Sequence, residues 1–118
     1  MKLFTPKEAN NTLPLVKRII SDILKVGTEL REAAMASPDY EAEVEKLKKI
    51  LFEYTSELEE LGCLYKDWNF ETGLVDFPAM IGGEHVYLCW RGDEEQVIYY
   101  HGISEGYTGR KIIPEEYL

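Results

Sequence analysis

The sequence predicts an α+β fold, in which a long antiparallel helical hairpin packs on a small, mainly antiparallel β-sheet of about four strands. Apolar residues recur every three or four positions before Gly62, and every second position after it. The length of 118 residues suits a single domain, 1–118, with one core. We therefore expect residues 1–62 to form the helical hairpin, and residues 63–118 to form the sheet and a C-terminal tail.

The first helix is predicted to begin at Thr5, because Thr5 and Glu8 have the spacing of a capping box and Pro6 lies between them. Pro14 lacks a backbone N–H and crowds the preceding turn, so we expect a short helix and then a kink or restart near residues 11–13. The main helix should continue to about Ala36. Its apolar stripe consists of Val16, Ile19, Ile20, Ile23, Leu24, Leu30 and Ala34.

The second helix is expected to be capped by Ser37 and Pro38 and to end at Gly62, a residue type typical of C-terminal caps. The link over residues 35–40 is short, so the two helices should be antiparallel neighbours. The apolar positions alternate steps of three and four, as in a coiled-coil pair. They are Val44, Leu47, Leu51, Tyr54, Leu58 and Leu61.

Four strands are predicted in the second half, over residues 63–68, 74–77, 85–91 and 96–101. Gly82 and Gly83 indicate a hairpin turn before the third strand. Pro78 has no N–H to donate, so it should end the second strand at a sheet edge. We expect the tail over residues 102–118 to be irregular.

The register of the last hairpin is predicted from the face that must be buried. A four-residue loop over residues 92–95 would pair Trp90 with Val97 and Val86 with His101. The face expected to cover the helices then carries Val86, Leu88, Trp90, Val97, Tyr99 and His101. A slip that sets His85 opposite His101 would scatter the apolar residues over both faces.

Composition excludes several classes of function. The formal net charge is -9, with no basic stripe, so duplex nucleic acid and anionic membranes would be repelled at long range. The N-terminus has no signal-peptide pattern, and no apolar run is long enough to cross a bilayer. Cys63 and Cys89 fit two reduced thiols in a cytoplasmic protein, although a disulfide between them remains an alternative. We expect neither a nucleic-acid nor a membrane partner.

Three residues are candidates for acid–base catalysis: His101, Asp76 and Glu105. His101 ends a predicted strand and would act as a general base or a ligand; the alternative is a histidine hydrogen-bonded to backbone. Asp76 lies between two apolar residues and should point opposite to them, where a carboxylate must be paired or solvated. It would be an acid, or it would hold a turn or an arginine.

The sharpest local pattern lies in the C-terminal segment, at Gly106, Gly109 and Arg110. Glycines three apart allow backbone amides to converge on an anion, and the arginine adds a planar fork for a carboxylate or phosphate. These three are therefore candidate ligand-binding residues. In the alternative interpretation the glycines shape a turn, and Arg110 pairs internally with Asp76 or Glu105.

Neither a metal site nor a cofactor is predicted. The plausible metal ligands match no known spacing, and the preferred register separates the two histidines. They are His85, His101, Cys63, Cys89 and Asp76. Cys89 with a nearby histidine is the candidate for nucleophilic catalysis, but its neighbours Leu88 and Trp90 indicate a packed, inert thiol.

Six segments together resemble the bacterial domain of unknown function 2203 family, and the resemblance covers nearly the whole chain. They are Phe4–Asn10, Leu13–Val16, Gly73–Ala79, Leu88–Arg91, Tyr100–His101 and Gly106–Arg110. The resemblance implies a small bacterial cytosolic protein and no assigned activity. Tyr100 departs from the family pattern, which has a tryptophan before the histidine, and any contact of that ring with a ligand would differ accordingly.

Two classes of function follow. Helices longer than the sheet would leave part of their apolar stripes uncovered. We therefore predict a protein-interaction module that self-associates as a dimer through its helices. The alternative is a small anionic-ligand-binding protein or an enzyme with a site around His101 and Arg110, to which Trp90, Asp76 and Glu105 contribute. Whether the protein is an enzyme stays open.

Overall fold

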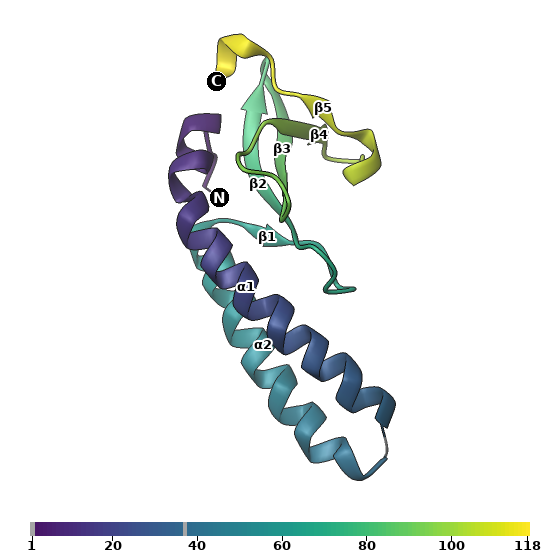
Figure 1. Ribbon diagram of the computed structural model, residues 1–118. Helices are drawn as coiled ribbons and strands as arrows, with labels where there is room; N and C mark the ends of the chain where they lie inside the picture. Colours follow the sequence, from purple (N-terminus) through teal and green to yellow (C-terminus); the bar gives the residue numbers. More distant parts are fainter. Residues whose placement is uncertain (1, 37) are drawn as a thin grey trace.

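The computed structural model describes residues 2–36 and 38–118, and within them it contains two long helices, five strands and three short 3-10 helices (Figure 1). The two long helices run side by side as an antiparallel hairpin, and the sheet lies against one end of it. This arrangement confirms the predicted α+β fold, with one strand more than expected. The hairpin extends beyond the sheet, so the molecule measures 54 × 25 × 24 Å.

Helix α1 spans Pro6–Ala36 and starts at the predicted capping box. The Thr5 N–H donates to Glu8 Oε1 at 3.0 Å, and the Glu8 N–H donates to Thr5 Oγ1 at 3.1 Å. The expected restart near residues 11–13 is wrong, because one continuous helix passes through Pro14. Pro14 is exposed, so the helix accommodates its ring on the side away from the core.

Helix α2 spans Glu41–Leu61 and follows a 3-10 turn over Pro38–Tyr40. The predicted cap at Ser37 lies outside the described residues, and Tyr40 occupies the N-cap position without a side-chain hydrogen bond. The predicted C-terminal cap is confirmed: Gly62 has a φ of 95° and its N–H donates to the carbonyl of Glu59. The chain leaves this cap directly into the sheet.

The sheet is an antiparallel meander whose strands lie in chain order. Its strands are β1 Leu64–Tyr65, β2 Leu74–Ile81, β3 Glu84–Arg91, β4 Tyr99–Gly102 and β5 Lys111–Ile112. Two expectations are corrected: β2 continues through Pro78, and the tail contributes β5. Pro78 is tolerated because β1 is too short to reach it, so its missing donor faces an edge.

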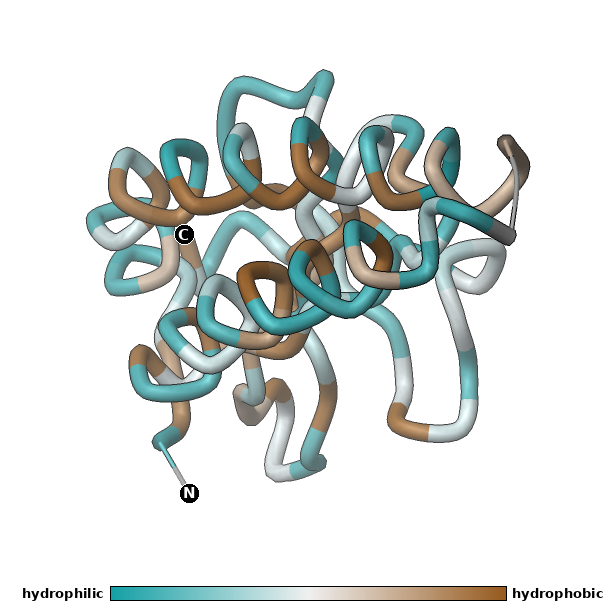
Figure 2. Tube along the Cα trace, turned by 90° about the horizontal axis from the view of Figure 1, so that it is seen from below, coloured by the Kyte–Doolittle hydropathy of each residue, from teal (hydrophilic) through white to brown (hydrophobic). Residues whose placement is uncertain are grey.

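The core lies between the inner face of the sheet and the helices. Apolar residues recur along both helices in Figure 2, and on β2 and β3 every second residue joins the same cluster. The inner-face members are Val75, Phe77, Ala79, Val86, Leu88 and Trp90. Most of the predicted helical stripe is buried as well, including Ile20, Ile23, Leu47 and Leu51.

The register between β3 and β4 differs from the prediction by one residue. His101 pairs with Tyr87, and Tyr99 pairs with Cys89. His101 and Tyr99 therefore lie on the outer face, away from the helices, whereas the prediction placed both on the inner face. Val97 is buried in the core as predicted, but it precedes β4 and does not pair with Trp90.

The described residues contain no helix apolar enough along its length to span a bilayer.

Candidate functional site

A pocket of about 330 Å³ opens on the outer face of the sheet. Its floor is formed by alternate residues of three adjacent strands, β2, β3 and β4. Its walls come from the segment after β1 and from the loop between β4 and β5. The lining residues that bear on its chemistry are Lys66, Asp76, Tyr87, Cys89, His101 and Glu105.

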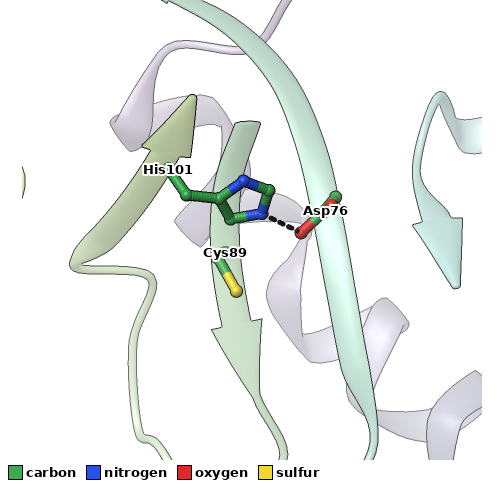
Figure 3. Close-up of side chains that lie close together, drawn as sticks. All are labelled: Asp76, Cys89 and His101. Carbon is green, nitrogen blue, oxygen red and sulfur yellow. Dashed lines mark hydrogen bonds and ion pairs between the residues drawn. The ribbon is translucent and has the colours of Figure 1, made fainter. Parts of the chain in front are cut away.

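Asp76 and His101 form a buried pair across β3 (Figure 3). The Nε2 of His101 lies 3.1 Å from Oδ1 of Asp76, and the two side chains are 4% and 5% exposed. Among the described residues, these are the buried polar or charged ones. Both strands direct them outward because their neighbours Val75 and Phe77, and Tyr100, contribute to the core.

The second ring nitrogen of His101 determines how this pair works. Its Nδ1–H donates to the carbonyl oxygen of Gly102 at 2.8 Å. In this tautomer the Nε2 of a neutral ring carries a lone pair that faces the Asp76 oxygen. Two electron-pair donors at 3.1 Å repel each other, so a proton or another cation must lie between them.

Cys89 completes a cluster of three side chains. It pairs with Asp76 on β2 and with Tyr99 on β4, so its sulfur points to the same face. One donor atom from each of Asp76, Cys89 and His101 lies within 4.8 Å of the others, and all three residues are buried (Figure 3). The sequence prediction treated Cys89 as a packed thiol, and it missed this proximity because of the register.

Burial dominates the electrostatics of the cluster. It raises the pKa of the Asp76 carboxyl, against the opposing attraction of His101. Burial, together with the Asp76 charge, raises the pKa of the Cys89 thiol to about 12. A free thiolate is therefore disfavoured here, and Cys89 does not have the lowered pKa of an activated nucleophile.

Arg110 lies beside the pocket but is already engaged. Its guanidinium is 2.9 Å from Glu94 Oε1 and lies over the rings of Tyr99 and Tyr107, 4.1 and 4.3 Å from their centroids. Its side chain is only 11% exposed. The internal pairing that the sequence left open therefore exists, with Glu94 as the partner in place of Asp76 or Glu105.

The remaining candidate residues have separate places. Glu105 lines the pocket, but its Oε1 accepts the Gly102 N–H at 3.0 Å, so this carboxylate closes a turn. Gly106 lines the wall, and Gly109 packs against Glu105. Trp90 is buried on the inner face, where its Nε1–H donates to the Glu94 carbonyl. The structure thus brings His101, Asp76, Glu105 and Gly106 together and places Trp90 in the core.

Lys66 is a charged pocket residue that the sequence pattern did not indicate. It is exposed, its ammonium lies 6.0 Å from the ring centroid of Tyr87, and no salt bridge of the described residues includes it. Asp76, Cys89 and His101 each alternate with core residues along their strands. With the correct register of β4, this alternation would have indicated that the three side chains share the outer face of the sheet.

The family model described as "Uncharacterized conserved protein (DUF2203)" matches residues 2–113. The match confirms the resemblance indicated by the sequence motifs. No curated protein and no solved structure matches the chain.

Proposed function

The chain belongs to the DUF2203 family of uncharacterized conserved proteins, and from its geometry we propose that it binds a small anionic molecule in the outer-face pocket. The observation that supports this proposal is the burial of Asp76 and His101 at the floor of a pocket. Burying ionisable groups costs free energy, and a fold that needs only packing would place apolar residues there. Perturbed ionisable groups in a cleft are typical of binding and catalytic sites.

Lys66 is the pocket residue that would attract an anion. It stands on the wall of the pocket, and no salt bridge of the described residues includes it. The carboxylates nearby are already engaged, Asp76 with His101 and Glu105 with the Gly102 N–H. A carboxylate or phosphate entering the pocket would therefore form its ion pair with the Lys66 ammonium, which no salt bridge of the described residues occupies.

Titration of the full chain with inorganic phosphate and with succinate, followed by amide NMR, tests this function. We expect the amide signals of Lys66 and Gly106 to shift while those of α2 do not. Lys66→Met should weaken the response about tenfold, equivalent to about 1.4 kcal/mol. Lys46→Met, which removes an exposed lysine of α2, is the matched control and should change nothing. Equal responses of the two variants would refute the proposed site.

A second candidate function is self-association through the helices, which a specific surface favours. Phe52 of α2 is 71% exposed in a shallow hollow whose rim carries charges of both signs. The rim residues are Glu45, Lys48, Lys49 and Glu53. In a two-fold pairing, the lysines of one copy would face the glutamates of the other around the two Phe52 rings.

Sedimentation equilibrium over a range of concentrations tests self-association. Phe52→Lys should convert a dimer to a monomer, whereas Leu15→Lys, at an exposed apolar residue of α1, should leave the dimer intact. A wild-type chain that stays monomeric at every concentration would exclude this function.

A further inference from the structure

We propose that Asp76, Cys89 and His101 bind one divalent transition-metal ion of the zinc type, with one coordination position open to the pocket. This inference deepens the proposed function and rests on it, because the anion would be bound by the metal at that open position. Lys66 would then face the part of the anion that points away from the metal.

The geometry suits three metal ligands. Metal bonds of about 2.0–2.3 Å at tetrahedral angles place the ligand atoms about 3.3–3.8 Å apart. The Nε2 of His101 and Oδ1 of Asp76 are 3.1 Å apart, and all three donor atoms lie within 4.8 Å of one another. Movements of the side-chain donor atoms by about 1 Å would bring them to the separations of a tetrahedral site. The ligands stand on three adjacent hydrogen-bonded strands, which hold them more rigidly than loops would.

The hydrogen bonds around His101 support the same assignment. The Gly102 carbonyl accepts the Nδ1–H, so the Nε2 lone pair points at Asp76. Metal-binding histidines commonly donate their other N–H to a carbonyl or carboxylate in this way. A cation between Nε2 and the carboxylate would relieve the repulsion between these donors, with the sulfur of Cys89 as the third donor.

The ligand types select the kind of metal. One nitrogen, one sulfur and one carboxylate oxygen form a mixed set that suits zinc, whereas magnesium and calcium prefer oxygen alone. On binding the ion, the Cys89 thiol would release its proton to solvent, because a thiol must be deprotonated to bind a metal. The resulting thiolate and the Asp76 carboxylate would balance the two positive charges of the ion, so the buried cluster would be neutral. Three protein ligands with a fourth position facing a pocket is the arrangement of zinc sites that bind substrates.

Titration of the metal-free full chain with Co²⁺ tests the site, because Co²⁺ replaces zinc and reports its ligands by colour. We expect one Co²⁺ per chain and a thiolate-to-cobalt charge-transfer band in the near ultraviolet. Cys89→Ser should abolish that band. Cys63→Ser removes the other buried thiol and is the matched control, so it should leave the band unchanged.

Asp76→Asn and His101→Gln provide tests that do not depend on the folding of the serine variant. Each should weaken Co²⁺ affinity at least about 100-fold, since the loss of an outer-shell partner alone costs about 10–100-fold. Absence of a charge-transfer band in the wild-type chain would overturn the metal site. Survival of the band in Cys89→Ser would also overturn it.

Adding phosphate to the cobalt protein separates this inference from the proposed function. A change in the visible d–d bands would support an anion on the open metal position. If the charge-transfer band forms but phosphate changes neither the d–d bands nor the pocket amides, the metal site holds and the anion-binding function fails. If phosphate shifts the pocket amides but no Co²⁺ binds, the function holds and the metal site fails.

Discussion

Replacement of Arg110 by alanine should lower the stability of the fold without abolishing the pocket. The guanidinium is bonded to Glu94 at 2.9 Å, and both side chains are largely shielded from water. A hydrogen bond to a charged group is worth about 1.5–3 kcal/mol. The contacts with the rings of Tyr99 and Tyr107 add about 0.5–1 kcal/mol each. Allowing for partial exposure, we expect Arg110→Ala to reduce the free energy of unfolding by about 2–4 kcal/mol.

Urea unfolding measures this loss, and a double-mutant cycle assigns it. Glu94→Gln alone and in combination with Arg110→Ala should reveal a coupling energy of about 1–2 kcal/mol. Arg110→Lys keeps the charge but loses the planar group that lies over the two rings, so it should recover only part of the loss. Arg18→Ala removes an exposed arginine of α1 and is the control; it should change stability by less than about 0.5 kcal/mol.

A structural role for Arg110 is refuted if Arg110→Ala unfolds like the wild type but no longer binds phosphate. That result would mean that the guanidinium leaves Glu94 to take the ligand, as the sequence-based prediction of Arg110 as a ligand-binding residue requires. Zero coupling between Arg110 and Glu94 would show that their contact contributes nothing to folding.

Three further predictions concern other parts of the fold. Gly27→Ala should destabilise the protein by about 1 kcal/mol in urea unfolding, because a Cβ there would overlap the Phe70 ring. The cost of overpacking, about 1–3 kcal/mol, outweighs the gain of about 1 kcal/mol in helix propensity. A variant more stable than the wild type would contradict this packing. The net pKa of the Asp67 carboxyl lies below its usual 3.8. Burial, the largest single influence, acts to raise this pKa, but four backbone N–H groups that donate to the carboxylate together lower it by more. The stability that the Asp67 carboxylate adds is therefore complete at neutral pH and is lost as the pH falls below about 3.8. Asp67→Asn should make the free energy of unfolding depend less on pH in this acid range. An unchanged pH dependence there would refute the prediction. Cys63 and Cys89 should react with a thiol reagent only after unfolding, since burial raises the pKa of each thiol to about 12; rapid reaction of the native protein would contradict their burial.

Local patterns predicted the helical half almost completely. The capping box at Thr5 and Glu8 and the glycine cap at Gly62 both depend on residues close together in the chain, so they can be recognised without knowing the fold. Pro14 was misjudged for the opposite reason. The tertiary packing of a 31-residue helix outweighs the one hydrogen bond that its ring removes.

The candidate site was predicted only in part, and one residue of register accounts for the difference. Both faces of the last hairpin are rich in apolar and aromatic residues, so alternation could not decide which face is buried. Val97 looked like part of a strand, but its N–H and carbonyl are bonded to the side chain of Asn10 on α1. That long-range contact ends the loop later than expected, and β4 starts at Tyr99.

The chain by itself determined its two long helices and the order of the first four strands, because hydrophobic period, caps and turn glycines act over a few residues. Only the tertiary structure decided that His101 faces outward, beside Asp76 and Cys89. The reason is that a shift of one residue in strand pairing moves every side chain of β4 to the other face. That shift depends on contacts between segments far apart in the chain, such as the one between Asn10 and Val97, which are 87 residues apart.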